Sequence, residues 1–294
     1  MAFVTIGIPV YNEEKHLEET IKSALAQEFK DIEIVISDNG STDRSAEIIR
    51  KYADLDKRIT PIYKEKNSGP AANFHSLLDN TRSKYFVVLG AHDLFLPNYI
   101  GEAVAFLESN PDYVMAYPKS KLVDGNDDKL GYFDSDIDTF GLDAGQRMKK
   151  TAANLFWCTC FHGVFRTDIV RNLPTLQIRG SDHLFLYAAA YHGHIHFIQK
   201  LGILRRESRQ ETPEMIEKRR IKAGNYRETG SRFFNAWSVT AMEHVMFIFE
   251  KTNLSTLRKL ILSISIALIF KRRFGVLPSI LIAYVNRNRY YTGT

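Results

Sequence analysis

Apolar and polar positions follow two alternating patterns along the first 110 residues of the chain. Four mainly apolar segments predict strands: residues 3–10, 32–37, 59–63 and 85–89. Residues 3–10 form a continuous run, as a strand buried on both faces would. The segments after these runs carry apolar residues at helical spacing, which predicts a helix after each strand. We expect Asn12 to cap the first helix and Ser41 or Thr42 to cap the second. This alternation predicts an α/β fold with a largely parallel sheet.

The pattern is less regular after residue 110. Residues 121–138 are acidic and rich in turn formers, so we expect an exposed or mobile segment there. Thr167 and Asp168 are expected to cap a short helix, and residues 180–198 predict a helix followed by a strand. Two apolar stretches near the C-terminus are shorter than the roughly 20 residues that span a bilayer, so each is interpreted as a buried or an interfacial helix.

Polar residues follow each of the four predicted strands: residues 11–13, 38–39, 66–67 and 92–93. Ligands of open α/β sheets bind at the carboxyl ends of the strands. Each polar group alone is consistent with a turn or a helix cap. Because all four occur at strand ends, we expect them to face one crevice that binds a ligand.

Composition is that of an ordinary globular protein, with 45% hydrophobic and 25% charged residues among 294. The two cysteines, Cys158 and Cys160, argue against a disulfide scaffold and are expected to be buried thiols in a reducing compartment. Three histidines at alternate positions resemble metal ligands, but strand alternation places only His194 and His196 on one face. A zinc site would need further ligands, so we interpret these histidines as structural.

Positive charge is concentrated at the C-terminus. Residues 251–294 carry eight basic residues and no acid, whereas the whole chain has a net charge of +5, so residues 1–250 carry −3. Basic segments that also have an apolar face are attracted to anionic lipid headgroups. We therefore expect a cytoplasmic protein, without a secretion signal or a nucleic-acid partner, that binds the inner face of the cell membrane. The alternative is that the C-terminal helices pack on the rest of the chain or form a homo-oligomer.

Four segments occur in a characteristic order: IPVYNEEKHLEETIKSALAQ, IEIVISDNGSTDRSAEII, NSGPAANFHSLL and YFVVLGAHDLFLPNYI. Together they resemble the family 2 glycosyltransferases, whose GT-A fold is a Rossmann-like, mostly parallel sheet with helices on both faces. The resemblance is strong over residues 3–110 and continues to about residue 210. It implies a catalytic domain over residues 1–215, with a nucleotide-sugar donor half (1–110) and an acceptor half (111–215). Residues 216–294 are then a helical, basic C-terminal extension.

The resemblance also implies a donor site. Its members after the first three strands and at the third helix are Pro9, Tyr11, Asn12, Glu13, Asp38, Asn67, Gly69 and Asn73. An aromatic face and polar groups at the edge of a nucleotide base suit such recognition. The metal-binding Asp-x-Asp position of the family corresponds to Ala91, His92 and Asp93. Since Ala91 replaces the first aspartate, Asp93 is expected to hold a divalent cation, Mg²⁺ or Mn²⁺, against the donor diphosphate, with His92 beside it.

The family takes its general base from an acidic residue that precedes a helix, and Asp182 matches that position. The alternative is that Asp182 only caps the helix and has no catalytic role. A basic cluster at residues 204–211 lies where relatives close a loop over the diphosphate, so Arg206 is a further donor-binding candidate. The family's histidine after the arginine is replaced by Glu207, and a solvated loop is the competing interpretation.

The resemblance implies an inverting glycosyltransferase of the hexosyltransferase type. It would transfer a sugar from a nucleoside-diphosphate donor, a UDP-sugar, to a glycan or lipid-linked acceptor in polysaccharide assembly. One alternative is a sugar nucleotidyltransferase, although residues 9–18 lack the Gly-rich, basic loop of those enzymes. The other is a noncatalytic nucleotide-sugar-binding or scaffold protein with a degenerate metal motif.

Overall fold

The structure is a computed structural model that describes residues 2–123, 129–133, 137–155, 158–174, 178, 180–206 and 236–275. A nine-stranded mixed sheet forms its centre, in the order β3-β2-β1-β4-β8-β6-β9-β5, with β7 paired to β6. The strands are β1 (Val4–Val10), β2 (Ile32–Asp38), β3 (Ile59–Tyr63), β4 (Tyr85–Val88), β5 (Leu94–Phe95), β6 (Tyr113–Val123), β7 (Lys129–Phe133), β8 (Val164–Arg166) and β9 (His194–Arg206). Strands β1 to β4 pair in parallel, as the sequence predicts.

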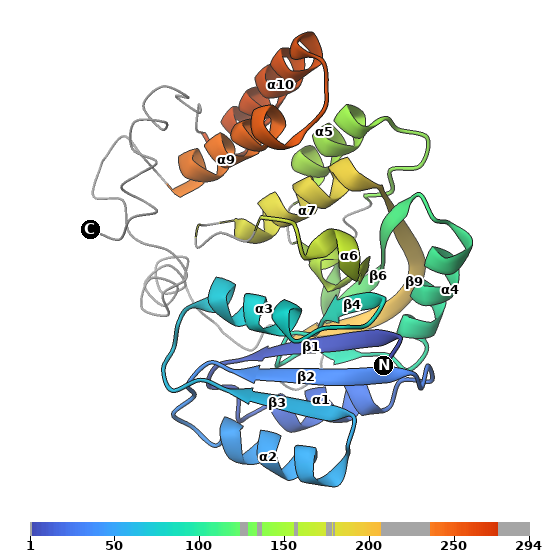
Figure 1. Cartoon of the computed structure of the whole chain (residues 1–294), viewed down its shortest axis with the longest axis vertical. Helices are drawn as coiled ribbons and strands as arrows, with labels where there is room; N and C mark the ends of the chain where they lie inside the picture. The colour runs from blue at the N-terminus through green and yellow to red at the C-terminus, as the bar shows by residue number, and fades with distance from the viewer. Residues whose placement is uncertain are drawn as a thin grey trace.

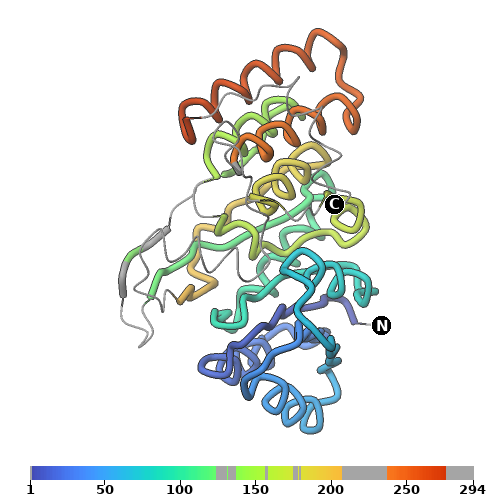
Figure 2. Tube along the Cα trace, turned by 90° about the vertical axis from the view of Figure 1, so that its left-hand side faces the viewer, coloured from blue at the N-terminus to red at the C-terminus, as the bar shows by residue number. Residues whose placement is uncertain are grey.

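Helices cover both faces of the sheet (Figure 1). They are α1 (Leu17–Leu25), α2 (Ser45–Leu55), α3 (Pro70–Asp79), α4 (Tyr99–Ser109), α5 (Ala144–Asn154), α6 (Thr167–Val170), α7 (Ser181–His192), α9 (Ala236–Lys251) and α10 (Thr256–Phe274), with a 3₁₀ turn η1 (Thr159–His162). Helices α9 and α10 lie at one end of the molecule, far from the end formed by α1, α2 and β3 (Figures 1 and 2).

Two hydrophobic cores lie on opposite faces of the sheet because side chains of a strand alternate between its faces. On β1, Val4, Ile6 and Ile8 pack with residues of α1, α2 and α4. On the other face, Phe86 and Val88 of β4 pack with α3 and belong to the core that includes α5, α7, α9 and α10. Burial on both faces is the physical reason why these strands read as continuous apolar runs.

The predicted caps of the first two helices are wrong. Helix α1 begins at Leu17 after His16, and α2 begins at Ser45 after Arg44. The residues expected to cap them bond to each other instead: the side-chain oxygen of Asn12 accepts a hydrogen bond from the backbone N–H of Thr42 at 2.8 Å. The two loops therefore use these polar groups to hold one another, and each helix starts one turn later. The short helix predicted near residue 167 is present as α6.

The half of the chain after residue 110 contains more regular structure than the sequence indicates. Strand β6 extends to Val123, whose side chain is fully buried, and Ile137 is fully buried too. The expectation of an exposed or mobile segment is wrong at these positions, although residues 124–128 and 134–136 lie outside the described part of the chain. Helix α5 was also missed, and its N-terminus carries a capping box of Asp143 and Gln146.

Three sequence interpretations can be compared with the packing. Both cysteines are buried and free, as predicted. His194 and His196 each have a protein partner, the carbonyl of Thr139 at 2.7 Å and the carboxylate of Asp138 at 3.0 Å, so a structural role accounts for them. Among the described residues, no helix is long and apolar enough to cross a membrane. Residues 276–285 of the second apolar stretch lie outside that part of the chain.

Candidate functional site

The carboxyl ends of β1 and β4 form the point from which the site is built. The chain runs from β1 outward through β2 to β3 on one side, whereas β4 lies on the other side of β1. Ligands of such sheets bind where the strand order reverses in this way. Side chains from the two strand ends meet there, because Nδ1 of His92 lies 3.2 Å from Oε1 of Glu13. The predicted groups at residues 11–13 and 92–93 are therefore adjacent.

The loops after β1 and β2 hold each other in place. Asn12 has a positive φ of 55°, an uncommon backbone conformation for this residue type outside turns. Its backbone N–H donates to the hydroxyl of Ser41 at 3.0 Å, and the N–H of Ser41 donates to the buried carboxylate of Asp38 at 3.1 Å. Tyr11 remains 37% exposed beside them. A polar edge and an accessible aromatic face thus lie side by side, as recognition of a nucleotide base requires.

Asn39 organises the neighbouring loop. The sequence placed it among the polar residues at strand ends but gave it no role in the donor site. Its side-chain amide donates to Oδ1 of Asn67 at 2.9 Å, while its carbonyl oxygen accepts from the N–H of Ser68 at 3.1 Å. Asn67 also accepts from the N–H of Gly69, which has a φ of 86° that favours glycine. The position of Asn39 directly after Asp38, at the end of a buried strand, was the available signal.

Asn73 serves the framework rather than the strand ends. Its side chain is 3% exposed. The hydroxyl of Ser37 donates to its oxygen at 2.6 Å, and its nitrogen donates to the Ser37 carbonyl at 3.0 Å. These bonds attach α3 to β2, and Pro9 lies opposite Ser37 in the β1–β2 register. Asn73 and Pro9 therefore support the loops that carry the exposed site residues.

Asp93 is buried at the end of β4, with 2% of its surface exposed. Its N–H donates to the carbonyl of Gly90 at 2.9 Å, which closes the turn that contains Ala91 and His92. Oδ1 accepts a hydrogen bond from the backbone N–H of Arg206 at 3.0 Å. A Cβ atom on Gly90 would lie 2.6 Å from Oδ2 of Asp93, so only glycine leaves room for this carboxylate.

His162 faces the same carboxylate and was not singled out from the sequence. Its Nε2 lies 3.6 Å from Oδ2 of Asp93, and its Nδ1 lies 3.0 Å from the carbonyl of Val88. A carbonyl only accepts hydrogen bonds, so Nδ1 must carry the proton. Burial lowers the pKa of His162 to about 4, which keeps the ring neutral near pH 7 and leaves a lone pair on Nε2. Two electron-donating atoms therefore face one another, and that pair of ligands suits a divalent cation such as Mn²⁺.

Arg206 lies beside Asp93 but is paired with another acid. Its Nη2 donates to Oε2 of Glu19 on α1 at 2.5 Å, and its side chain is only 2% exposed. The arginine expected near the diphosphate is thus a buried side chain at the end of β9 rather than part of a solvated loop. Residues 207–235, which include Arg209, lie outside the described residues.

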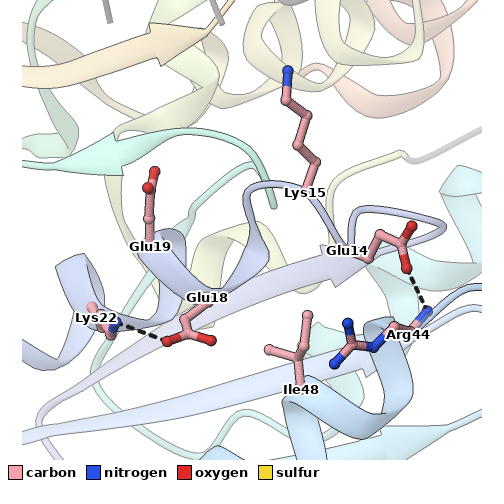
Figure 3. Close-up of a pocket in the computed structure, with 7 residues that line it drawn as sticks. All are labelled: Glu14, Lys15, Glu18, Glu19, Lys22, Arg44 and Ile48. Atoms are coloured by element: carbon pink, nitrogen blue, oxygen red, sulfur yellow. Dashed lines mark hydrogen bonds and ion pairs between the residues drawn. The ribbon is translucent and has the colours of Figure 1, made fainter. Parts of the chain in front are cut away.

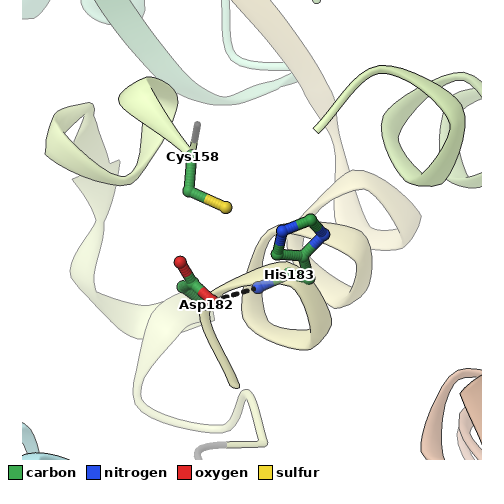
Figure 4. A group of neighbouring side chains, drawn as sticks. All are labelled: Cys158, Asp182 and His183. Atoms are coloured by element: carbon green, nitrogen blue, oxygen red, sulfur yellow. Dashed lines mark hydrogen bonds between the residues drawn. The ribbon is translucent and has the colours of Figure 1, made fainter. Parts of the chain in front are cut away.

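Asp182 lies in the first turn of α7, next to Cys158 and His183 (Figure 4). Ligand atoms of the three side chains lie within 4.8 Å of one another. The backbone N–H of His183 donates to Oδ1 of Asp182 at 3.0 Å. Burial, and then the negative charge of Asp182, raises the pKa of Cys158 well above its usual value, and burial lowers the pKa of His183. A neutral thiol and a neutral imidazole therefore surround the carboxylate, and the three could also hold a metal ion.

The turn η1 connects the Asp93 and Asp182 groups. Cys158 precedes η1 with a left-handed φ of 49°, an uncommon conformation that is found at functional sites. His162 is its last residue. Burial raises the pKa of Cys158 and lowers the pKa of His162. The positive charge of Arg205 lowers the pKa of both residues as a smaller effect. The predicted metal ligand and the predicted base are therefore held by one short segment.

A polar hollow of about 320 Å³ lies between α1 and α2 (Figure 3). It is lined by Glu14, Lys15, Glu18, Glu19, Lys22, Arg44 and Ile48. None of the predicted site residues lines it, and two of its charged side chains pair with each other, Lys22 with Glu18 at 2.8 Å. We therefore place the candidate site at the strand ends and not in this hollow.

Sequence comparison connects this arrangement with known proteins. The profile of the family described as glycosyl transferase family 2 matches residues 5–173, more than half of the chain. An uncharacterized glycosyltransferase of Haemophilus influenzae is 33% identical over 151 residues, which are 51% of this chain and 60% of that protein. Another, from Methanocaldococcus jannaschii, is 33% identical over 132 residues, 44% of this chain and 46% of that protein. The matched region thus spans about half the length of these relatives.

Solved structures share the fold. TarS of S. aureus, in complex with UDP-GlcNAc, superposes with a TM-score of 0.68 at 19% identity, over 94% of this chain and 74% of that chain. A mannosyltransferase of Pyrobaculum calidifontis, in complex with GDP-Man and Mn²⁺, gives a TM-score of 0.55 at 14% identity, over 99% and 81% of the two chains. These likenesses confirm the predicted GT-A architecture.

Proposed function

Because the chain belongs to glycosyl transferase family 2, we propose that it transfers a sugar from a nucleoside-diphosphate sugar to an acceptor hydroxyl. The observation that carries this proposal is the 3.2 Å contact of Glu13 with His92, the chain neighbour of the buried Asp93, where the strand order reverses between β1 and β4. The donor would lie there, with its base against Tyr11, Asp38 and the loop after β2. We propose a UDP-sugar as the donor, since structures of TarS contain UDP and UDP-GlcNAc.

A divalent cation would be held by Asp93 and His162. Support comes from their 3.6 Å separation, from the lone pair that His162 turns toward the carboxylate, and from burial of both side chains. A carboxylate oxygen and an imidazole nitrogen favour Mn²⁺ over Mg²⁺, which prefers oxygen ligands. When bound, the cation would neutralise charge on the donor diphosphate. Arg206 would add positive charge nearby, since its backbone N–H donates to Asp93 while its buried guanidinium is bonded to Glu19.

Asp182 would act as the general base of an inverting displacement. The acceptor hydroxyl attacks the anomeric carbon, its proton passes to the Asp182 carboxylate, and the bond between that carbon and the diphosphate oxygen breaks with its electron pair on the diphosphate. Asp182 lies at the N-terminus of α7, where the helix dipole favours its charged form. Burial lowers the pKa of the neighbouring His183, which makes its imidazole a weaker base, and burial raises the pKa of Cys158, which keeps it a thiol.

The acceptor would be a hydroxyl of a glycan or of a lipid-linked sugar, which would place the enzyme in polysaccharide assembly. The walls that select it are expected in residues 110–180, most of which belong to the proposed acceptor half. One feature favours a noncatalytic alternative, because Ala91 replaces the family's first metal-binding aspartate. The carbonyl of Ala91 accepts a hydrogen bond from the hydroxyl of Thr20 at 3.0 Å. Under that alternative, the protein binds a nucleotide sugar as a scaffold and does not turn it over.

Nucleotide-sugar binding and turnover by the purified chain test the proposal. We expect a UDP-sugar with Mn²⁺ at about 100 times the dissociation constant to stabilise the fold by roughly 2.7 kcal/mol, seen as a rise in melting temperature. Asp93→Asn should lose the Mn²⁺-dependent part of this rise and release less UDP from the donor. Asn keeps the oxygen that accepts from Arg206, so the turn should survive.

Asp138→Asn is the matched control, because Asp138 forms another aspartate–histidine pair, with His196, outside the site. This variant should retain both the Mn²⁺ effect and turnover. Undiminished Mn²⁺-dependent stabilisation in Asp93→Asn would contradict the metal assignment. Stabilisation by the donor without any release of UDP or transfer, for every nucleotide sugar tested, would favour the scaffold alternative.

A further inference from the structure

The outer face of α10 is apolar and open to solvent. Helix α10 lies at the end of the molecule opposite α2 (Figures 1 and 2). Large aliphatic side chains recur along it at helical spacing, and each is about half to two-thirds exposed: Leu257 (67%), Leu260 (48%), Ile261 (57%), Ile264 (62%) and Leu268 (58%). Globular surfaces rarely display so many aliphatic residues in one stripe, and such patches mark binding surfaces.

The opposite face of the same helix is fixed to the body of the protein. Leu262, Ile266 and Phe270 are buried in the core shared with α5, α7 and α9. Arg273 donates to the carbonyl of Ala152 at 2.6 Å, which attaches the end of α10 to α5. The inner face of α10 is therefore already packed against the body of the protein, so the helix cannot rotate to bury its aliphatic stripe.

Basic side chains border the stripe. Lys271 and Arg272 follow Leu268 by three and four residues, which places them one turn beyond it, and both are exposed. Arg258 stands three residues before Ile261 with a side chain 64% exposed, and its nearest acid is Asp143 at 3.9 Å. Residues 251–294 contain no acid. The stripe is therefore apolar along its centre and positive at its edges.

We infer that this face of α10 docks in the plane of an anionic lipid surface, with the aliphatic side chains among the acyl chains and the basic ones at the headgroups. Aliphatic residues bordered by Lys and Arg are what an interfacial helix requires. A second copy of the chain fits less well, because pairing two such faces would bring like charges together with no acid on α10 to offset them. The α10 stripe is thus a membrane contact, and it requires nothing of the proposed reaction.

Vesicle co-sedimentation of the full chain tests this inference. Vesicles of phosphatidylglycerol and phosphatidylcholine should bind the protein at low salt, and vesicles of phosphatidylcholine alone should bind it much less. The double variant Ile261→Asp/Ile264→Asp should lower the affinity for anionic vesicles by at least about tenfold, since two aliphatic side chains no longer enter the interface. Lys271→Gln and Arg272→Gln should each lower it about fivefold, and the loss should vanish in high salt.

Leu55→Asp is the matched control, because Leu55 is a 72% exposed leucine on α2 at the other end of the molecule. It should bind vesicles as the wild type does. All variants should keep the wild-type circular dichroism and donor-induced stabilisation, so that lost docking is separated from lost folding and from a failed donor site. Wild-type protein that ignores anionic vesicles at low salt would overturn the inference. So would equal binding by the Ile261/Ile264 variant, or a wild-type dimer that this variant dissociates while vesicles remain unbound.

Discussion

Replacing Asp182 with asparagine removes the proposed base while preserving its surroundings. The amide oxygen of Asn can still accept the hydrogen bond that the N–H of His183 gives to Oδ1 at 3.0 Å, so the first turn of α7 should remain. Loss of a general base lowers turnover by roughly 10²- to 10⁴-fold. At about 1.4 kcal/mol per factor of ten, the barrier should rise by about 3–6 kcal/mol. The stability loss should be small, about 0.5 kcal/mol from the missing charge at the helix N-terminus.

The assay compares turnover with donor binding in the same preparation. We expect kcat for sugar transfer to fall by the factor above, while the dissociation constant for the UDP-sugar changes less than about threefold, because Asp182 acts on the acceptor. Asp168→Asn is the control, since Asp168 also lies in the first turn of a helix but is exposed. It should leave both quantities unchanged.

Two results would refute the role of Asp182 as a base. Equal turnover in Asp182→Asn and wild type would make Asp182 part of the helix start only. Alternatively, the variant could lose a bound metal ion that elemental analysis finds in the wild type. That outcome would assign Asp182, with Cys158 and His183, to a metal site and would leave the base to another residue.

Two further predictions concern stability. Gly180→Ala should lower the free energy of unfolding, measured by urea denaturation, by about 1–3 kcal/mol. Gly180 has a φ of 72°, and an added Cβ would lie 2.8 Å from the ring of Trp237. An equally stable variant would contradict this reasoning. Burial lowers the pKa of His244 to about 3, so between pH 6.5 and 3 the unfolded chain binds a proton that the folded chain refuses, and stability falls as pH falls. His244→Leu should reduce the slope of unfolding free energy against pH in that window by up to about 1.4 kcal/mol per pH unit, and an unchanged slope would show that His244 titrates normally.

Local pattern was sufficient for the half of the fold that carries the strand ends. The four predicted strands match β1 to β4 closely. For β1, β2 and β4 the reason is that a strand buried on both faces must be largely apolar along its length, whereas β3 is a partly exposed edge strand. Short-range pattern failed for β8, a three-residue strand that lies between β4 and β6. Its strand conformation depends on two partners that are remote in sequence, so nothing within residues 164–166 indicates it.

The candidate site divides in the same way. The sequence identified Asp93, Asp38 and the loop at residues 11–13 because each follows a predicted strand, and strand ends of a parallel sheet lie together. It did not identify His162 as the neighbour of Asp93, because the two are 69 residues apart and η1 has no distinctive pattern. The sequence also showed the apolar and basic residues of α10, but it did not indicate which of the apolar ones pack in the core and which face solvent.

The sequence by itself therefore determined the elements whose cause is local: the buried strands, the polar residues that end them, and the separation of a basic C-terminal segment from an acidic body. Only the tertiary structure decided which of these side chains meet. Asp93 receives a hydrogen bond from the N–H of Arg206, 113 residues away, and faces a histidine whose pKa is low because it is buried. Distance and burial arise from packing between remote segments, and a pattern of neighbouring residues does not contain them.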